Sequence, residues 1–338
     1  MKLIVTGGAG FIGSSFVRMS LKQGWAEQVI NVDKLTYAGN LENLEPVAEH
    51  PGYRFVQADI CDADAIEDLF SKESPDAVVH FAAESHVDRS IHSPAPVIQT
   101  NFNGTFTLLE AARRYKIGRF VHVSTDEVYG SIEPPHEADE TYPLHASSPY
   151  SASKAGSDLL ALSYYTTYKL NVSVTRASNN YGPYQFPEKL IPLMISNALE
   201  DKPLPIYGDG QQIRDWLYVE DHCRAVRTVL EKGEPGEVYN IGGNCSLPNL
   251  EVVRRILKAT GKPESLLTRV ADRPGHDRRY ALTNAKLTRQ TGWEPEMDFD
   301  QGLSKTVEWY LANQPWVNRV KTGEYRAFYD LNYANRAT

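Results

Sequence analysis

The sequence predicts an α/β protein in which a doubly wound parallel sheet carries a smaller mixed α/β lobe. A glycine-rich turn at 7–13 separates an apolar strand from a helix, and strand and helix patterns then alternate regularly as far as residue 176. The alternation stops near residue 179. With 338 residues and 41% hydrophobic content, the chain can form one large domain or two closely packed ones.

Composition limits the partners that we expect. The formal net charge is −8 and no polybasic run is present, so we expect neither a nucleic-acid partner nor a membrane partner. No apolar run has the length of a signal peptide or a membrane span. Cys61, Cys223 and Cys245 are widely spaced and show no metal or disulfide pattern. We therefore expect a cytoplasmic protein without a metal site.

The first strand and helix have the pattern of a dinucleotide site. Residues 3–5 form a short apolar strand that runs directly into the glycine-rich turn, and a helix follows to about Gly24. Glycines at 7, 10 and 13 allow a tight turn, close approach of a pyrophosphate and close packing of helix on strand. A second strand at 29–32 ends in Asp33, about 20 residues after the last glycine, where the adenosine ribose needs an acceptor. Asp33 favours NAD because it would repel a 2′-phosphate.

The following elements continue the alternation and place polar residues at the ends of strands. The remaining strands and helices of the sheet are expected, in chain order, at 53–58, 63–70, 77–80, 94–115, 119–124, 149–168 and 172–176. Asp59, the turn at 82–85 and the triplet 125–127 each follow a predicted strand. Ligands bind at the carboxyl ends of the strands in such sheets, so we expect these residues to lie at one site.

A tyrosine and a lysine lie four residues apart at the start of the helix predicted to begin at Pro149. Tyr150 and Lys154 would share one helix face, and the ammonium would lower the pKa of the phenol. Asp126 and Glu127, at the end of the preceding strand, would supply an acid and a base. This combination can move a hydride, a proton and a leaving group on one carbon skeleton.

The sequence beyond residue 179 is richer in Pro, Gly and Arg. We expect loops with exposed basic and aromatic groups at 205–210, 213–216 and 272–276, and a strand at 237–240 that returns to the main sheet. These patterns predict a dinucleotide-binding domain at 1–178 with a returning segment near 218–245, and a second lobe made of 179–217 and 246–338.

Seven motifs spread over nearly the whole chain lie at 6–13, 35–40, 82–90, 124–130, 150–154, 179–184 and 272–277. With these motifs the sequence resembles the extended short-chain dehydrogenases/reductases that act on nucleotide sugars, and especially the branch of dTDP-glucose 4,6-dehydratases. The triplet 125–127 carries most of the specificity, because it separates the dehydratases from epimerases and decarboxylases.

The resemblance implies a Rossmann-type fold, NAD as cofactor and the dehydration of dTDP-glucose to dTDP-4-keto-6-deoxyglucose. The implied route is transient oxidation at C4, loss of water across C5 and C6, and return of hydride to C6. In it Tyr150 with Lys154 deprotonates the C4 hydroxyl, Thr125 binds the C4 oxygen, Glu127 removes the C5 proton and protonated Asp126 donates to the leaving oxygen. Related proteins pair two helices into a dimer bundle, so the helices at 94–115 and 149–168 are expected to form a homodimer.

The resemblance also implies binding residues. Those for NAD are Gly7, Gly10, Phe11, Ile12, Gly13, Asp33, Lys34, Leu35, Thr36, Asp59, Ile60, Phe81, Ala82, Ala83, Ser85, Thr100, Tyr150, Lys154 and Asn180. Those for the nucleotide sugar are Ser85, Thr125, Asn179, Lys189, Leu190, Pro205, Ile206, Tyr207, Arg214, Asn249, Arg273 and His276. The side-chain chemistry of the arginines and of the tyrosine supports these binding roles, since arginines pair with phosphate and a tyrosine can stack on a pyrimidine.

Two alternatives stay open from the sequence. An NAD-dependent nucleotide-sugar 4,6-dehydratase, 4-epimerase or decarboxylase acting on a UDP-sugar would share most of these residues, although an epimerase or decarboxylase has no use for Asp126 and Glu127. A non-catalytic NAD-binding sensor on the same fold would need neither Tyr150, Lys154 nor Thr125. The choice of dTDP over UDP rests on the resemblance alone.

Overall fold

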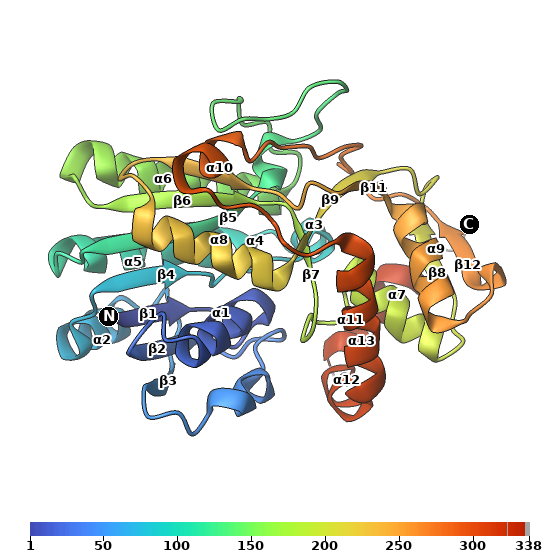
Figure 1. Ribbon diagram of the computed structural model, residues 1–338, viewed down its shortest axis with the longest axis horizontal. Helices are drawn as coiled ribbons and strands as arrows, with labels where there is room; N and C mark the ends of the chain where they lie inside the picture. Colours follow the sequence, from blue (N-terminus) through green and yellow to red (C-terminus); the bar gives the residue numbers. More distant parts are fainter. Residues whose placement is uncertain (323, 335–338) are drawn as a thin grey trace.

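The computed structural model describes residues 1–322 and 324–334 and contains a seven-stranded parallel sheet next to a smaller lobe (Figure 1). The sheet has the order β10-β6-β5-β4-β1-β2-β3. Every neighbouring pair in it is parallel. Its strands are β1 (Lys2–Thr6), β2 (Gln28–Asp33), β3 (Tyr53–Gln57), β4 (Ala77–His80), β5 (Arg119–Thr125), β6 (Val172–Ala177) and β10 (Val238–Ile241). The order reverses at β1, as in a doubly wound sheet. The predicted fold class is confirmed.

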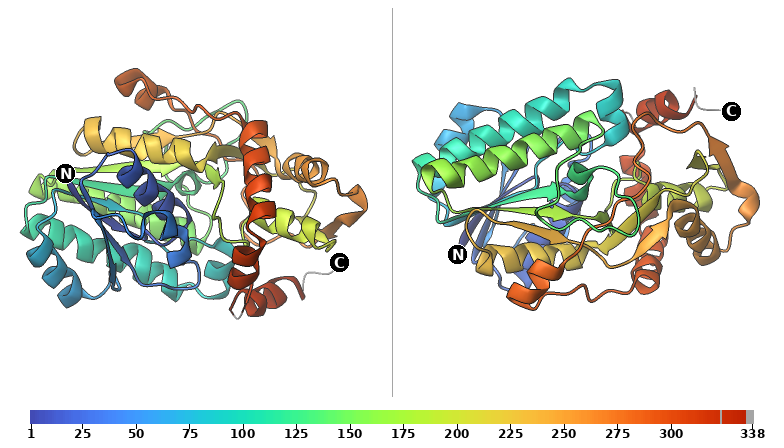
Figure 2. Two further views of the ribbon diagram at one scale, coloured as in Figure 1. Left: turned by 60° about the horizontal axis from the view of Figure 1, so that its bottom comes forward. Right: turned by 90° about the horizontal axis from the view of Figure 1, so that it is seen from above.

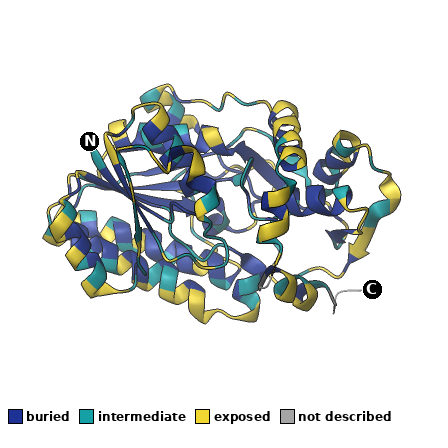
Figure 3. Cartoon of the chain, turned by 90° about the horizontal axis from the view of Figure 1, so that it is seen from below, coloured by how far each residue is buried: buried dark blue, intermediate teal, exposed yellow. Residues whose placement is uncertain are grey.

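Helices cover both faces of the sheet (Figure 2). Helices α1 (Phe11–Lys22) and α8 (Val219–Lys232) pack on the face formed by Leu3 and Val5. Helices α2 (Ala63–Glu73), α5 (Thr105–Arg114) and α6 (Pro149–Tyr168) pack on the opposite face, where Ile4 lies. Alternate residues of β1 therefore enter two separate cores, which explains why the strand is a continuous apolar run. Figure 3 shows the buried sheet between helices whose outer faces are exposed.

The smaller lobe has its own core. It contains a three-stranded sheet of β7 (Asn179–Tyr181), β9 (Ile213–Tyr218) and β11 (Ser246–Pro248), and a two-stranded sheet of β8 (Leu204–Tyr207) and β12 (Leu267–Val270). These strands pack against α7 (Leu190–Leu199), α9 (Asn249–Thr260), α11 (Phe299–Ala312) and α12 (Gln314–Val320). The short helix α10 (Ala285–Thr291) lies beside β10, and α13 (Glu324–Ala334) follows α12.

The loops predicted at 205–210 and 213–216 are partly or wholly strands, so the prediction was wrong there. Residues 205–207 belong to β8 and 208–210 form a turn, whereas 213–216 belong to β9, where Arg214 and Trp216 are buried rather than exposed. Pro205 and the glycines at 208 and 210 suggested a turn for the first stretch. However, β8 is one strand of a two-stranded ribbon, and a proline is tolerated in such an edge strand. The stretch 272–276 is irregular, as expected.

The predicted helix at 94–115 is helical but not regular. It begins with α4 (Ala95–Val97), widens into the π-helical segment η2 (Ile98–Gly104) and continues as α5. Gly104 lies so close to Ile60 that a Cβ on it would fall 2.5 Å from the Ile60 Cδ1 atom. The wider turn thus coincides with a close packing contact that residue spacing does not reveal.

Candidate active site

A cavity runs along the carboxyl ends of β1, β2, β4, β5 and β6 and continues to the smaller lobe. Its wall includes nearly all predicted cofactor residues, namely Gly7, Gly10, Phe11, Ile12, Gly13, Asp33, Lys34, Thr36, Asp59, Ile60, Phe81, Ala82, Ala83, Ser85, Thr100, Tyr150, Lys154 and Asn180. Leu35 is the exception and lines a neighbouring cleft. The shared position at the strand ends is what the alternating pattern predicts.

The glycine-rich turn at the start of α1 requires glycine for steric reasons. Gly7 has φ +70°, and a Cβ on it would lie 2.5 Å from the Ala82 backbone nitrogen. A Cβ on Gly13 would lie 2.2 Å from the Gly7 carbonyl oxygen. This close packing leaves backbone N–H groups at the helix N-terminus facing the cavity, where a pyrophosphate can bind.

The Asp33 carboxylate, at the end of β2, already accepts hydrogen bonds within the protein. Asp33 accepts from the backbone N–H of Ala9 at 2.9 Å and of Leu35 at 2.8 Å. Burial raises the pKa of Asp33, and these two hydrogen bonds oppose that rise. Each carboxylate oxygen has a second lone pair, so Asp33 can still accept from ribose hydroxyls. Lys34 forms an ion pair of 2.6 Å with Asp59.

Strand β5 delivers the triplet 125–127 into the cavity. The strand ends at Thr125, whose Oγ1 accepts from the Glu127 N–H at 3.3 Å and so caps the 3-10 turn η3 (Asp126–Tyr129). Asp126 is 4% exposed, and burial together with the neighbouring Glu127 charge raises its pKa well above the usual range. Glu127 is less buried, and its Oε2 lies 3.4 Å from the Tyr280 hydroxyl. The two adjacent carboxyls therefore have different surroundings.

Helix α6 places Tyr150 and Lys154 in the same cavity, next to the end of β5. Ser148 caps the helix, with Ser151 returning the hydrogen bond, and Pro149 occupies its first turn, as predicted. The Lys154 ammonium donates to the Val123 carbonyl at 2.9 Å.

The pKa of the tyrosine differs from the prediction. Burial, followed by the Glu127 charge, raises the pKa of Tyr150 above its usual value. Burial also lowers the pKa of Lys154 to about 8. The expected lowering of the phenol pKa by the ammonium is therefore wrong for these surroundings, because the cost of burying a phenolate outweighs it.

The predicted substrate residues divide into two groups. Ser85, Thr125, Asn179, Lys189 and Leu190 line the cavity, and the Lys189 ammonium donates to the Ser85 carbonyl at 2.5 Å. The others lie in the smaller lobe beyond the cavity wall, namely Pro205, Ile206, Tyr207, Arg214, Asn249, Arg273 and His276. Ile206 is buried in the core of that lobe.

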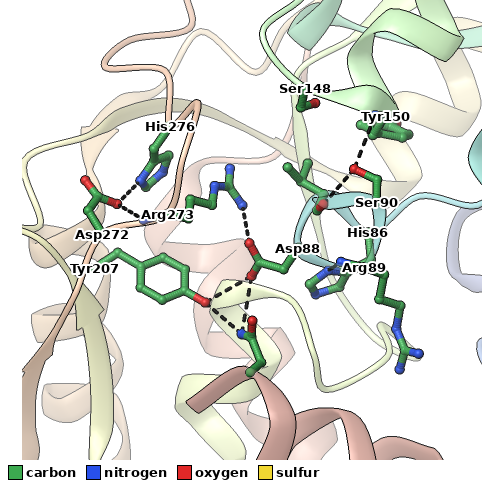
Figure 4. A network of polar contacts seen from close by, with 12 residues as sticks. His86, Asp88, Arg89, Ser90, Ser148, Tyr150, Tyr207, Asp272, Arg273 and His276 are labelled. Atoms are coloured by element: carbon green, nitrogen blue, oxygen red, sulfur yellow. Dashed lines mark hydrogen bonds and ion pairs between the residues drawn. The ribbon is translucent and has the colours of Figure 1, made fainter. Parts of the chain in front are cut away.

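Several lobe residues meet at the short helix α3 (Val87–His92), as Figure 4 shows. The buried Asp88 carboxylate lies 3.4 Å from an Arg273 nitrogen, and it accepts from the Tyr207 hydroxyl at 3.0 Å. On the other side of α3, the Ser90 hydroxyl accepts from the Tyr150 backbone N–H at 3.3 Å. One short helix thus connects the lobe with the helix that carries the tyrosine.

Two further nitrogen-bearing side chains lie near this region, Arg214 and His276. The Arg214 guanidinium donates to the Asp277 carbonyl at 2.9 Å and lies 4.0 Å from the centre of the Tyr280 ring. His276 forms a 2.5 Å contact with Asp272, while burial and the Arg273 charge lower its pKa to about 4. His276 is thus neutral at pH 7 and can contact an anion only as a hydrogen-bond donor.

Sequence reasoning did not identify several residues at the site. Ala38, Gly39, Glu84, Gln185, Glu188, Trp216 and His222 line the cavity, and Tyr280 contacts Glu127 from the smaller lobe. Gly39 and Glu84 lie inside motifs that the sequence analysis singled out, so their position could have been anticipated. Tyr280 has no such signal, since a long-range contact places it.

The described part of the chain holds no group of three or more His, Cys, Asp or Glu side chains arranged for a metal ion. None of the helices in that part combines the length and apolar character that crossing a membrane requires.

Comparisons with known proteins agree on one family. The sequence model of the GDP-mannose 4,6 dehydratase family matches residues 4–306. A dTDP-glucose 4,6-dehydratase of Salmonella typhimurium is 54% identical over 362 aligned residues, covering 99% of this chain and 100% of the relative. One of Neisseria meningitidis is 55% identical over 96% of this chain and 97% of the relative.

Solved structures give the same result. A dTDP-glucose 4,6-dehydratase from Streptomyces venezuelae with NAD and dTDP bound is 50% identical, has a TM-score of 0.93, and covers 95% of this chain and 100% of its own. A UDP-glucose 4-epimerase from Thermus thermophilus with NAD is 32% identical, with a TM-score of 0.86 and coverage of 93% and 100%. The dehydratase is thus similar in sequence as well as in fold, whereas the epimerase shares mainly the fold.

Proposed function

The chain belongs to the 4,6-dehydratase family that the GDP-mannose 4,6 dehydratase model describes and that includes the dTDP-glucose 4,6-dehydratases, and we propose that it dehydrates dTDP-glucose. The product is dTDP-4-keto-6-deoxyglucose, and the reaction is a lyase reaction with no net redox change. The single observation that carries this proposal is the pair Asp126 and Glu127, one buried and one less buried, in the cavity that Tyr150 and Lys154 line.

The cavity fits a dinucleotide. The cradle at Gly7 and Gly13 has no room for a Cβ, and the N-terminus of α1 faces the position that a pyrophosphate would occupy. Asp33 is available to the adenosine ribose, where it disfavours a 2′-phosphate. NAD bound there supplies a hydride acceptor and donor and, in its oxidised form, a positive charge beside Tyr150.

Removal of the C4 hydroxyl proton is the proposed task of Tyr150. Because burial raises its pKa, the phenolate needs nearby positive charge, and Lys154 one helical turn away provides it. Thr125 stands at the end of β5 in the same cavity and holds the C4 oxygen through its hydroxyl. With NAD as the acceptor of the C4 hydride, loss of this proton would give a C4 ketone, which acidifies the C5 proton that is otherwise too weakly acidic to remove.

Elimination of water is the proposed task of the two carboxyls. Glu127 removes the C5 proton, and Asp126 donates a proton to the departing C6 oxygen. Burial and the neighbouring Glu127 charge raise the pKa of Asp126 well above its usual range, which favours the protonated form that a general acid needs. The Tyr280 hydroxyl, 3.4 Å from Glu127, keeps the carboxylate turned toward the cavity. The same two residues can then guide the return of a proton to C5.

The nucleotide part of the substrate would bind toward the smaller lobe. Arg214 and Arg273 provide guanidinium groups for the diphosphate, with Lys189 at the cavity wall. Tyr207 lies beside them and offers a ring face to a pyrimidine. The preference for dTDP over UDP is supported by the relatives, which act on dTDP-glucose by name.

The assembly and the surroundings of the protein are also proposals. Helices α5 and α6, with the preceding η2, expose Ile98, Phe106, Leu159 and Tyr168, each at least 46% exposed. Large apolar groups on adjacent helices support a homodimer formed through this face.

Free Cys61, Cys223 and Cys245 support a reducing compartment, the cytoplasm. We also propose two domains. The first is 1–178 with a returning segment near 218–245, and the second is a lobe made of 179–217 and 246–338.

Mass spectrometry of dTDP-glucose incubated with the purified protein tests the function. Loss of one water without added cofactor is the expected result, because the cofactor is regenerated in each cycle. An unchanged mass with a new sugar isomer would indicate a 4-epimerase and contradict the roles of Asp126 and Glu127. No reaction with dTDP-glucose, but dehydration of a UDP-sugar, would correct the substrate alone.

A further inference from the structure

A buried network of charged side chains lies between helix α6 and the sheet. Asp158 follows Lys154 by one turn on α6 and is fully buried. Its Oδ2 lies 2.9 Å from the Nε atom of Arg176 in β6, and its Oδ1 lies 3.4 Å from the Nε2 atom of His122 in β5. These three side chains are not part of the cavity wall, so none of the roles proposed above uses them.

The network reaches both elements that carry the catalytic groups. An Arg176 nitrogen donates to the Tyr129 hydroxyl at 3.0 Å, and that hydroxyl donates to the Asn240 side chain at 2.8 Å. Tyr129 is the last residue of η3, the turn that contains Asp126 and Glu127. The ion pair of Asp158 and Arg176 therefore links the turn that carries the carboxyls to the helix that carries Tyr150 and Lys154.

The Asp158 carboxylate is only partly compensated by hydrogen bonds. A buried carboxylate is costly unless donors or cations surround it. Within the described residues its Oδ1 has no hydrogen-bond donor in normal geometry, and His122 approaches no closer than 3.4 Å. The Lys154 ammonium is likewise buried, and its hydrogen bond goes to a neutral acceptor, the Val123 carbonyl. Lys154 and Asp158 are four residues apart on one helix face, and each charge favours the charged form of the other.

The other titratable groups around Lys154 cannot replace this carboxylate. Burial keeps the pKa of His80 in β4 and of His122 in β5 well below neutral pH, so both are uncharged. Arg176 is itself a cation, and burial raises the pKa of Tyr150, so in the absence of NAD the phenol supplies no anion that could replace the carboxylate. Burial lowers the pKa of Lys154 to about 8, and the carboxylate on the next turn opposes that shift.

We propose that Asp158 is a positioning residue that keeps Lys154 protonated inside the buried site, so that the ammonium can act on Tyr150 at neutral pH. This inference rests on the role of Lys154 in the proposed function. If so, the protonation of Lys154 depends on the negative charge of Asp158 and much less on the shape of the Asp158 side chain.

Two exchanges at one position separate charge from shape. Asp158→Asn keeps the shape and removes the charge, whereas Asp158→Glu keeps the charge and changes the shape. We expect Asp158→Asn to move the alkaline limb of the kcat–pH profile to lower pH by about one unit, corresponding to roughly tenfold less protonated Lys154. Asp158→Glu should leave the limb near its wild-type position. Asp221→Asn is the matched control: it removes a buried carboxylate that is paired with Arg224 and does not line the cavity, and it should leave the limb unchanged.

A second readout does not depend on turnover. NMR titration of the Lys154 side chain, assigned by comparison with Lys154→Met, should show the same downward shift in Asp158→Asn and not in Asp158→Glu. If Asp158→Asn does not fold, Asp158→Leu combined with Arg176→Met removes the buried pair together, an exchange that proteins tolerate, and should shift the Lys154 titration downward as well.

The inference is overturned if the Lys154 titration does not move in Asp158→Asn, or if Asp158→Glu moves it equally. Failure of the proposed function has a different signature, since the wild-type protein would then not dehydrate dTDP-glucose while the NMR titration could still be measured.

Discussion

Asp126 and Glu127 are neighbours in the chain, yet their carboxyl groups are in different surroundings. Asp126 is buried at the end of β5, while Glu127 is partly exposed next to Tyr280. Burial and the adjacent negative charge raise the pKa of Asp126 well above its usual range, which favours its protonated form. The pair can therefore divide into an acid and a base at one pH, which is what elimination of water requires.

Replacing the proposed base should separate oxidation from elimination. In Glu127→Gln we expect dehydration to fall about 10²- to 10⁴-fold, the usual contribution of a general base, while oxidation at C4 continues. Stopped-flow absorbance with dTDP-glucose should then show reduced nicotinamide that accumulates. Glu133→Gln, which alters an exposed carboxyl in the following loop, should behave as wild type. Normal dehydration by Glu127→Gln would show that another group is the base.

The proposed acid, Asp126, should affect the stability of the protein as well as its activity. A carboxyl whose folded pKa is raised contributes its full stability below its unfolded pKa, and that stability is lost as the pH rises through the folded pKa. Asp126→Asn resembles the protonated form, so its melting temperature should match wild type at low pH, exceed it increasingly as the pH rises above the ordinary aspartate pKa, and keep a constant lead above the folded pKa. Its dehydration rate should nevertheless be strongly reduced. An equal gap in melting temperature at all pH values would contradict a buried, protonated Asp126.

At the scale of elements, the turn between β1 and α1 illustrates how local sequence and tertiary contact combine. The glycine spacing and the flanking strand and helix are visible in the sequence. The reason for glycine at 13, however, is the Gly7 carbonyl oxygen, 2.2 Å from where a Cβ would lie. Both positions are rigid backbone, so neither can easily move away.

Adding a single methyl group to this turn should release the cofactor. In Gly13→Ala we expect the amount of NAD that remains bound after purification to fall at least several-fold, because α1 must shift away from the turn. The measurement is the absorbance of nicotinamide dinucleotide released by denaturation, per mole of chain. Gly118→Ala is a fair control, since its Cβ would come no closer than 3.1 Å to a backbone oxygen, at the other end of the sheet. Full NAD content in Gly13→Ala would show that the turn does not hold the pyrophosphate.

The whole molecule brings together residues that are far apart in sequence. Asp88, on a helix next to the cofactor cavity, meets Tyr207 and Arg273 of the smaller lobe, and Tyr280 reaches Glu127 from the same lobe. The base and the acid thus stand on the sheet, while groups that can orient the nucleotide stand on the lobe. Retention of a reactive keto intermediate requires both parts to close around it.

One surface exchange should test the assembly. Leu159 on α6 is 59% exposed, and Leu159→Asp would place a charge in the centre of the proposed dimer face. We expect light scattering after size exclusion to show a monomer in place of a dimer. Leu311→Asp alters a leucine that is 51% exposed on α11 in the smaller lobe and should leave the dimer intact. A dimer that survives Leu159→Asp would place the interface elsewhere.

The sequence alone determined the alternating fold, the glycine cradle and the positions of Thr125, Asp126, Glu127, Tyr150 and Lys154 at strand and helix ends. These features follow from local rules, because hydrophobic period, caps and glycine spacing act over a few residues. The same rules misread β8 and β9, which form by pairing with distant strands; in β8 this pairing overrides the local tendency of Pro205 to turn.

Only the tertiary structure decided the pKa directions and the long-range partners. Local spacing placed an ammonium beside Tyr150 and predicted a lower phenol pKa, whereas burial by the whole fold raises it. Likewise, nothing near Lys154 in sequence indicates that Asp158 meets Arg176 and His122 from two strands of the sheet. Desolvation and charge interactions depend on everything that surrounds a group in space, and a sequence records only its neighbours along the chain.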